Sequence, residues 1–438
     1  MDESWAALGL CNICRVCETV VMDGGLGEGR LPVRINMLAT AALDYVLPEE
    51  LIAMSPVSPR DSARLMVLKR SDPSYVEHVH VRDLPGVLGP RDLLVVNTTR
   101  VLPARFRAVR ADSGGRGEGL FIAERSVGTS ESGTGLVWQV LLKMRRVKPG
   151  VEVNLELNTP SGGRSGVWLK LIERVTRGDD AARAGASDEG ADGWLVAVVH
   201  DRSLDGQATT KMVLDRVGLP PLPPYILASR KRHELAMEDA RDRETYQTVY
   251  AAGGKDESHG SGSVAAPTAG LHFTPELLAR LSAAGVARAE VVLHVGMGTF
   301  KPVETEFVEQ HAMHAEWCSV PGETVRAMSG DEARRVVAVG TTTARTLESY
   351  ASLEEMRSHP ERSTRILITP GYHFKHVGAL MTNFHLPRST LMAMVGAFMD
   401  DDDSARGAGL ERLIGAYRVA IEMKYRFYSF GDAMLILP

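Results

Sequence analysis

The chain has few cysteines and no long apolar segment. Only 4 of its 438 residues are cysteine, too few for a disulfide framework in a chain of this size. No window holds the roughly 18 uninterrupted apolar residues that a membrane span needs. The amino terminus, Met1-Asp2-Glu3, lacks the cationic region of a secretory signal. We therefore expect a reduced, cytoplasmic protein with no membrane contact.

An excess of charge of one sign is also absent. Lys and Arg number 50 and Asp and Glu 55, for a net charge of -5, which excludes a chain-wide basic surface for nucleic acid. Hydrophobic residues make up 44% and charged residues 24%, which excludes disordered and fibrous chains. The length favours two or three domains. Any contact with RNA is therefore expected to be local.

Three of the four cysteines are crowded near the start of the chain. Cys11, Cys14 and Cys17 form a CxxCxxC pattern, which can bind zinc or an iron–sulfur cluster. A fourth ligand is missing nearby, and the segment is rich in glycine without sustained periodicity. We interpret residues 1–40 as a disordered extension and expect no metal site.

The pattern of apolar runs divides the remaining chain into two kinds of structure. From Leu93 to about Val199, short β-rich runs are separated by Gly and Ser, which is typical of an antiparallel barrel or sandwich. After the proline-rich stretch 220–224, strands alternate with helices, which indicates an α/β sheet covered on both faces. The sequence predicts a β-rich segment, residues 93–204, between α/β segments at 41–92 and 205–438.

Polar residues gather at three successive junctions between predicted strands and helices. These junctions are residues 266–273, ahead of a helix capped by Thr274, residues 340–348, with three threonines and Arg345, and residues 382–390. Helix starts favour anions, although a tight turn alone explains the first junction equally well. A purely structural junction needs only one cap and one glycine, so their convergence favours a binding site.

A further strand runs into a glycine-spaced loop, His294-Val295-Gly296-Met297-Gly298-Thr299. Open α/β sheets bind ligands at the carboxyl ends of their strands. The third glycine and the following helix of a dinucleotide fingerprint are missing. A ligand that carries a nucleoside or an amino acid is therefore favoured over NAD.

Two imidazoles and a carboxylate, His311, His314 and Glu316, fall within six residues. They are suited to zinc binding or to acid–base catalysis. The spacing is not HExxH, and a histidine in such a run is as often a surface or packing residue. A metal-dependent hydrolase therefore remains one alternative function.

The predicted β-domain contains a basic window. Residues 100–148 hold ten Lys and Arg against four Asp and Glu, a net charge of +6. A basic barrel face suits a nucleic-acid backbone, although a solvated surface explains the charge equally well. A non-catalytic RNA-binding protein is therefore a second alternative.

Several long strings, in one order, resemble the S-adenosylmethionine:tRNA ribosyltransferase-isomerases of queuosine biosynthesis, the QueA family. The strings include Asn97-Thr98-Thr99-Arg100-Val101, Tyr246-Gln247-Thr248-Val249-Tyr250, Ala265 to Phe273, Leu293 to Gly296, and Thr382 to Pro387. The resemblance implies a three-layer α/β/α body with an inserted Greek-key β-barrel.

The implied reaction moves the ribosyl group of S-adenosylmethionine onto 7-aminomethyl-7-deazaguanine (preQ1) at the wobble position of tRNA. Epoxyqueuosine forms, and adenine and methionine are released. S-adenosylmethionine is then a substrate, no cofactor is implied, and the partner is tRNA carrying preQ1. The chain shows no heptads or large apolar stripe, so we expect a monomer.

The resemblance also selects residues, although it leaves the identity of the general base open. Catalytic candidates are His272, His294, His311, His314 and His385, with Glu316 and Asp432 as carboxylates. Substrate-binding candidates are Asn97, Thr99, Arg100, Thr268, Gly270, Gly296, Gly298, Thr299, Arg345, Thr382 and Asn383. Arg345 and the helix start at 268–274 are expected to hold the methionine carboxylate.

Overall fold

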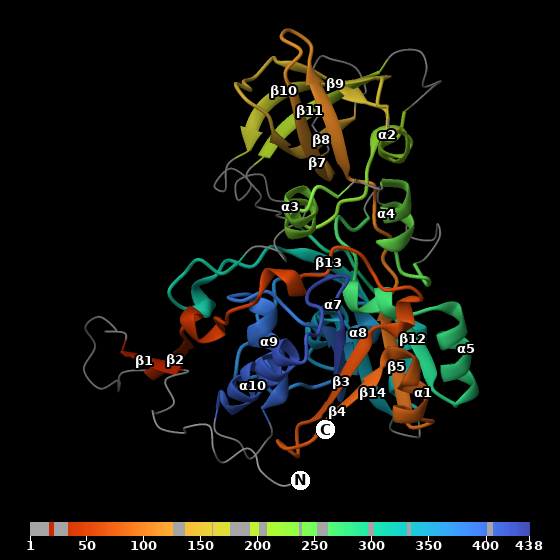
Figure 1. Ribbon diagram of the computed structural model, residues 1–438, viewed down its shortest axis with the longest axis vertical. Helices are drawn as coiled ribbons and strands as arrows, with labels where there is room; N and C mark the ends of the chain where they lie inside the picture. Colours follow the sequence, from red (N-terminus) through yellow and green to blue (C-terminus); the bar gives the residue numbers. More distant parts are fainter. Residues whose placement is uncertain are drawn as a thin grey trace.

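A mixed β-sheet forms the base of the molecule, and a β-barrel stands above it, as the computed structural model in Figure 1 shows. The structure describes residues 17–21, 34–125, 136–159, 161–175, 193–200, 208–235, 239–251, 262–296, 302–330, 334–400 and 406–438. Helix α2 (Thr210–Val217) packs beside the barrel, and α3 (Pro224–Arg232) and α4 (Asp239–Thr245) lie between the sheet and the barrel.

In the described part of the chain, nine strands form the sheet, in the order β15-β13-β12-β5-β14-β16-β17-β3-β4. Their bounds in chain order are β3 Arg64–Lys69, β4 Val76–His80, β5 Asp92–Asn97, β12 Ala287–Leu293, β13 Glu316–Ser319, β14 Arg335–Val339, β15 Glu361–Thr364, β16 Ala379–Asn383 and β17 Ala433–Leu437. The central strands β12, β5, β14 and β16 are parallel, so their carboxyl ends meet at one edge.

Helices cover both faces of this sheet. One face carries α6 (Gly322–Met328), α7 (Thr341–Glu348), α8 (Leu353–Ser358), α9 (Thr390–Met399) and α10 (Ala408–Glu422). The other carries α1 (Leu84–Val87), α5 (Pro275–Ala283) and the 3-10 helix Thr268–His272. Along β5, Leu93 and Val95 pack against the first set, and Leu94 and Val96 against the second. The predicted three-layer body is confirmed.

The barrel is closed and antiparallel. Its strands are β6 Arg105–Arg110, β7 Arg116–Arg125, β8 Val137–Lys143, β9 Glu152–Glu156, β10 Arg164–Val175 and β11 Gly193–His200, in the order β10-β11-β8-β7-β6-β9. After the meander β6–β8, strand β9 returns to lie beside β6, which makes the Greek-key arrangement. Buried aromatic rings, including Phe121 edge-on to Trp138, fill its interior.

The predicted boundaries of the inserted domain need correction at both ends. Strand β5 was expected in the barrel, but it pairs with β12 and β14 in the middle of the body sheet. Its continuous apolar run suits a strand that is buried on both faces. At the other end, Trp138 Nε1 of the barrel donates to Thr210 Oγ1 of α2, 2.8 Å away. The insert therefore spans Arg105 to Val217 and not 93–204.

The expected disordered extension, residues 1–40, contains ordered chain. Strands β1 (Cys17–Val21) and β2 (Arg34–Leu38) pair antiparallel, and the main-chain N–H of Leu38 donates to the carboxylate of Glu309. Leu38 itself is fully buried, so the prediction is wrong for these segments. Cys11 and Cys14 lie outside the described residues.

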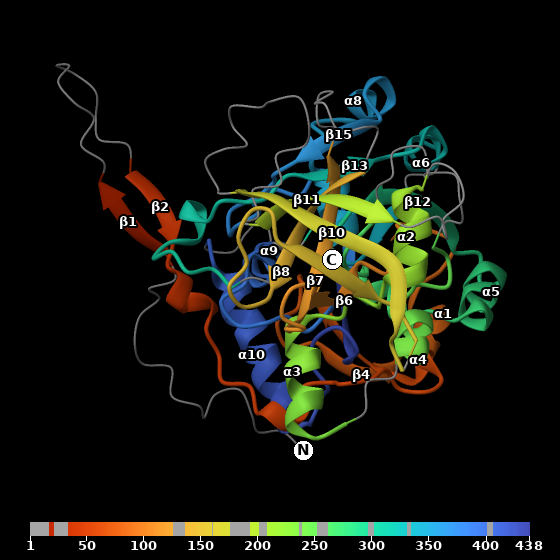
Figure 2. The same cartoon turned by 90° about the horizontal axis from the view of Figure 1, so that it is seen from above.

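Short 3-10 helices complete the body at Thr40–Leu43, Glu49–Leu51, Arg60–Ser62, Val81–Asp83 and Val308–Gln310. No helix in the described ranges combines the length and the apolar character that crossing a membrane requires. Seen from above in Figure 2, the barrel lies over the sheet, whose carboxyl edge is therefore the place to look for a site.

Candidate active site

Two cavities lie near the carboxyl ends of the parallel strands. The larger, of about 710 Å³, separates this edge from α2 and α4 and is called here the interdomain cavity. The smaller, of about 50 Å³, is lined by Thr268, Thr341, Thr342 and Thr382 with their neighbours and is called the threonine cavity. The larger volume is that of a site for a small molecule or an extruded base.

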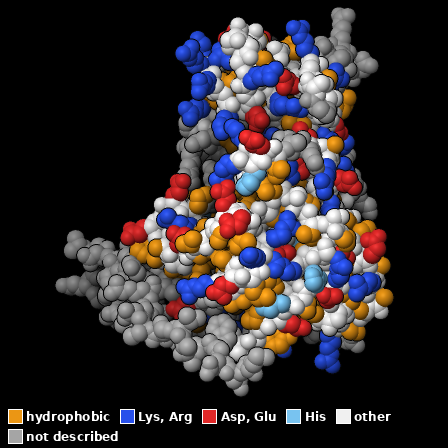
Figure 3. Space-filling view, in the orientation of Figure 1, with side chains coloured by type: hydrophobic (Ala, Val, Ile, Leu, Met, Phe, Trp, Pro, Cys, Tyr) orange, Lys and Arg blue, Asp and Glu red, His pale blue; other side chains and the backbone are white. Residues whose placement is uncertain are grey.

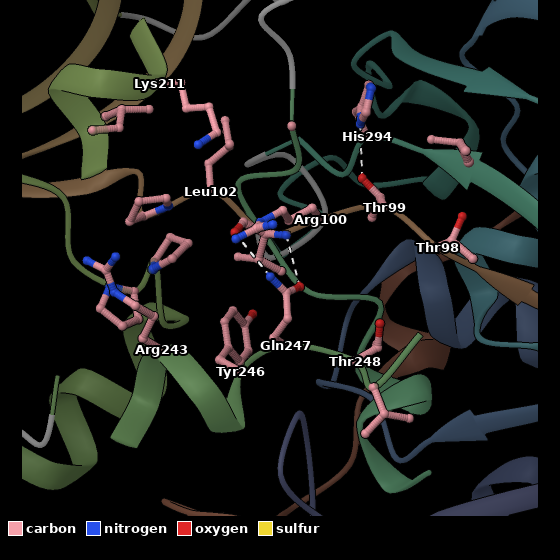
Figure 4. Close-up of a pocket in the computed structure, with 18 of the residues that line it drawn as sticks. Thr98, Thr99, Arg100, Leu102, Lys211, Arg243, Tyr246, Gln247, Thr248 and His294 are labelled. Carbon is pink, nitrogen blue, oxygen red and sulfur yellow. Dashed lines mark hydrogen bonds between the residues drawn. The ribbon is translucent and has the colours of Figure 1, made fainter. Parts of the chain in front are cut away.

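His294 is the predicted catalytic histidine that faces the interdomain cavity (Figure 4). Its Nδ1 lies 3.0 Å from Thr99 Oγ1, and its ring stacks on Trp317 with centroids 4.9 Å apart. Thr99 is held in turn, because its main-chain N–H donates to Asn97 Oδ1. An oriented imidazole on a cavity wall is suited to proton transfer.

Asn97 lies behind the cavity wall that carries His294 and Thr99. Its Nδ2 donates to the Leu293 carbonyl, and its Oδ1 accepts from the Leu293 N–H, both at 3.1 Å. The side chain is buried and joins the ends of β5 and β12. Asn97 was predicted to bind substrate, but it lines neither cavity. Its contacts instead fix the strand ends that carry Thr99 and His294.

Several cations surround the interdomain cavity, and most are occupied. Arg60 donates to the carbonyl of Gln247, Arg243 to that of Gly218, and Lys211 pairs with Asp215 on its own helix. The side chain of Arg100 is exposed and forms no hydrogen bond or ion pair with the described residues, while its carbonyl accepts from the Ser263 N–H. Its predicted role as a substrate ligand is compatible with this position.

The threonine cavity gathers residues from all three predicted junctions. Thr268 Oγ1 donates to Asn383 Oδ1 at 2.9 Å, and Asn383 Nδ2 donates to the Tyr428 carbonyl. Thr382 Oγ1 lies 2.7 Å from His385 Nε2. The structure thus brings together Thr268, Thr382, Asn383 and His385 in the way that the convergence of junctions suggested.

His385 lines the threonine cavity and is uncharged. Burial lowers its pKa to about 3, because a charged imidazole would lose its hydration there. Its main-chain N–H and carbonyl are engaged by Tyr417 and Tyr45. His385 can therefore hydrogen-bond a ligand, but it does not supply positive charge at physiological pH.

Two other catalytic candidates hold loops together and line neither cavity. The ring nitrogens of His272 lie 3.0 Å from the carbonyl oxygens of Ala269 and Gly431. Asp432 accepts from the main-chain N–H and the guanidinium of Arg64, and from the N–H of Arg426. These contacts connect distant segments, which is a positioning role.

Glu316 and Arg345 form a buried ion pair behind the loop that follows β12. The second carboxylate oxygen of Glu316 accepts from the Gly296 N–H at 3.0 Å. Arg345 Nε and Nη2 have no hydrogen-bond partner among the described residues. Neither side chain lines a cavity, so the pair supports the loop that begins at Gly296. Gly298 and Thr299, further along it, lie outside the described residues.

The residues of the hydrolase alternative are not arranged around a metal. His311 and His314 lie between the 3-10 helix Val308–Gln310 and β13 and line neither cavity. The carboxylate of Glu316 is directed to Arg345 instead. Within the described ranges, no group of three His, Cys, Asp or Glu side chains is placed to hold a metal ion.

Gly270 is required by packing. A Cβ at this position would stand 2.2 Å from the Tyr250 hydroxyl and 3.0 Å from Thr248 Cγ2. Thr248 lines the interdomain cavity, while Thr268 and Ala269 line the threonine cavity. Gly270 therefore belongs to the wall between the two cavities. The sequence had instead predicted it as a substrate-binding residue.

Sequence reasoning missed several residues of the site. Gln247 accepts from the Val101 N–H at 3.0 Å and so fixes the connection to the barrel. It belongs to a string that carried the family resemblance, which was the available signal. Trp317, which stacks on His294, had no such signal. Thr341, Thr342 and Ser389, which line the threonine cavity, lie in the predicted junctions but were not named as site residues, and Ser429 lies outside those junctions.

The predicted basic platform is smaller than its sequence charge indicates. Arg105 is buried against Asp239, and Arg125 donates to Gln139. Lys143, Arg145, Arg146 and Lys148 are exposed around the turn from β8 toward β9, and Arg110 donates to the carbonyls of Arg145 and Arg146. Figure 3 shows Lys and Arg side chains spread over the barrel.

Comparisons with known proteins identify the family. A family profile described as "Queuosine biosynthesis protein" matches residues 40–436. Proteins named S-adenosylmethionine:tRNA ribosyltransferase-isomerase are similar along nearly the whole chain. That of Heliobacterium modesticaldum is 42% identical over 404 residues, which cover 91% of this chain and 100% of the relative. That of Rubrobacter xylanophilus is 43% identical over 401 residues, covering 91% and 98%.

A solved structure is also similar in sequence. The crystal structure of S-adenosylmethionine tRNA ribosyltransferase from Thermotoga maritima aligns with 90% of this chain and 100% of its own, at 32% identity and a TM-score of 0.43. The profile match and the identities of the relatives decide the assignment. The chain belongs to the queuosine biosynthesis protein family, as its sequence predicted, and is a transferase.

Proposed function

We propose that the chain transfers and isomerises the ribosyl group of S-adenosylmethionine onto preQ1 at the wobble position of tRNA, giving epoxyqueuosine, adenine and methionine. The observation that carries this proposal is the interdomain cavity with His294 and Thr99 on its wall. The names of the relatives supply the two substrates. The enzyme is proposed to act as a cytoplasmic monomer that needs no cofactor.

His294 is the candidate general base. The sulfonium of S-adenosylmethionine acidifies the C5′ hydrogens, so an adjacent imidazole can remove one and leave an ylide. Adenine then leaves the sugar and takes up a proton, and the aminomethyl nitrogen of the tRNA base adds to the sugar. An alkoxide oxygen of the rearranged sugar closes the epoxide as the bond from C5′ to sulfur breaks and methionine leaves. The contacts of His294 with Thr99 and Trp317 fix the ring for the first of these steps.

The barrel is the candidate tRNA platform. Lys143, Arg145, Arg146 and Lys148 offer exposed positive charge to the phosphate backbone. A modified base must leave the anticodon stack to be reached, and the interdomain cavity lies between the barrel and the sheet edge. Arg100 lines the same cavity and is placed to contact an entering nucleotide.

Mass spectrometry of a reaction with S-adenosylmethionine and tRNA carrying preQ1 tests the proposal. We expect free adenine and methionine in equal amounts, matched by an epoxyqueuosine nucleoside in the digested tRNA. Unmodified tRNA with guanine at the wobble position is the matched control and should release no adenine. Absence of both products from a folded protein that binds S-adenosylmethionine would overturn the proposal.

A further inference from the structure

Helix α7 begins at the threonine cavity without a cap. Gly340 precedes it with φ of 89° and offers no side-chain acceptor. The first main-chain bond of the helix runs from Ala344 to Gly340, so the three N–H groups before it have no acceptor within the helix. Helix α9 differs, because the hydroxyl of Ser389 accepts from the Met392 N–H at its start.

The hydroxyl of Thr342 is a second, independent sign of a ligand. Thr342 is only 7% exposed and lines the threonine cavity, yet Oγ1 has no hydrogen-bond partner in the described structure. Two other threonines of α7 are satisfied, since Thr343 donates to the Val339 carbonyl and Thr346 to the Thr342 carbonyl. A buried hydroxyl without a partner is costly unless a ligand or water completes it.

The remaining described walls of the threonine cavity are uncharged and carry both polar and apolar side chains. Among the residues that the structure describes, its lining contains no carboxylate and no Lys or Arg. Burial keeps His385 neutral and raises the pKa of Tyr428 to about 12. The volume of about 50 Å³ is well below the roughly 300 Å³ of the smallest ligand pockets, so the cavity suits a small polar group and not a whole nucleoside. These walls suit one small anion held by helix N–H groups.

We propose that the threonine cavity binds the carboxylate of the methionine part of S-adenosylmethionine, at the start of α7 and on Thr342 Oγ1. This inference rests on the proposed function, which supplies the ligand. The helix start near residue 274 is a poorer anchor, because Thr274 already caps α5 by accepting from the Leu277 N–H.

The two cavities adjoin one segment of the chain. Val295 lines the threonine cavity, and the preceding residue, His294, lines the interdomain cavity. The cavities therefore meet at the same short segment after β12. A carboxylate anchored at α7 leaves the sulfonium and the nucleoside to extend toward His294.

Calorimetric binding of two ligands tests the inference. The ligands are S-adenosylmethionine and its decarboxylated analogue, which retains the adenosine, the sulfonium and the amine. We expect the wild-type protein to bind S-adenosylmethionine about tenfold more tightly than the analogue. Thr342→Val should weaken binding of S-adenosylmethionine about tenfold and leave binding of the analogue unchanged. Thr342→Ser, which keeps the hydroxyl, should behave as wild type, and Thr346→Val is the control on the same helix.

Each other result overturns the inference in a distinguishable way. Equal affinity of the wild type for the two ligands, or equal weakening of both by Thr342→Val, rejects the carboxylate site and leaves the proposed function intact. Weaker tRNA binding by Thr342→Val with unchanged S-adenosylmethionine binding assigns the cavity to a phosphate instead. Failure of the wild type to bind either ligand rejects the inference together with the proposed function.

Discussion

The two cavities differ in how the chain builds them. The interdomain cavity takes its walls from the sheet edge and from helices that connect to the barrel, and it contains charged groups of both signs. The threonine cavity lies at the sheet edge against α3, and its described polar lining consists of hydroxyls, an amide and a neutral histidine. The larger site therefore depends on how two folding units pack, whereas the smaller depends on one sheet edge.

The largest expected effect is loss of the base. His294→Gln should lower turnover by about 10²- to 10⁴-fold, because the imidazole is the proposed proton acceptor. Affinity for S-adenosylmethionine should change little, since the proposed anchor lies in the other cavity. Single-turnover kinetics with saturating substrates give the first quantity and calorimetry the second. His272→Gln is the matched control, and an equal kinetic loss in both variants would remove the distinction between them.

Removing positive charge from the barrel should weaken tRNA binding alone. In a variant with Lys143, Arg145, Arg146 and Lys148 all changed to Ala, tRNA binding should weaken. The slope of log affinity against log salt should fall by about 0.7 to 0.9 for each lost phosphate contact. S-adenosylmethionine binding should stay unchanged.

The matched control for this barrel variant is Arg280→Ala with Arg326→Ala, two exposed cations on helices of the body. Filter binding over a range of salt concentrations measures both proteins. The same salt dependence in the barrel variant and in the wild type would mean that the tRNA lies elsewhere.

A change in the wall between the cavities should disturb both. Gly270→Ala places a methyl group against the Tyr250 hydroxyl and Thr248 Cγ2. The neighbours must move, at a cost of about 1 to 3 kcal/mol in the free energy of unfolding. Gly86→Ala is the control, because a Cβ there meets nothing within 4 Å. Urea unfolding compares the two variants. An unchanged midpoint for Gly270→Ala would contradict the expected steric cost.

The smallest expected effect concerns pH. His385 has a pKa of about 3 when folded, against 6.5 ordinarily, so between these values the unfolded chain binds the extra proton. Its contribution to the free energy of unfolding is therefore complete above 6.5 and is lost as the pH falls, by at most about 1.4 kcal/mol per pH unit. His385→Gln should flatten this dependence in urea unfolding between about pH 7 and about pH 5. A slope identical to that of the wild type would contradict the burial argument.

Local sequence was sufficient to predict the junctions. A strand followed by a glycine, hydroxyl residues and a helix pattern is encoded within about ten residues, and the segments that contain Thr268, Thr382 and Asn383 were recognised in this way. The family resemblance, carried by longer strings, added the fold and the reaction. Both kinds of signal are properties of continuous segments.

What the sequence could not show depends on partners far along the chain. The run Leu93–Val96 has the same β-character in a barrel or in a sheet, and its partners in β12 and β14 decide between them. Glu316 looked like a metal ligand because Arg345, its actual partner, is 29 residues away. His272 and His294 both lie in strings that resemble the family. Only tertiary packing places His272 between two carbonyl oxygens and His294 on a cavity wall.

The insertion of the barrel after β5 also sets an order of assembly during synthesis. The side chain of Asn97 donates to the Leu293 carbonyl, and Leu293 is synthesised 196 residues later. The central strands cannot join before then. The barrel strands β6 to β11 all lie between these two residues and pair among themselves. The barrel can therefore close on the ribosome while β5 is still unpaired, and the sheet edge that carries His294 forms later.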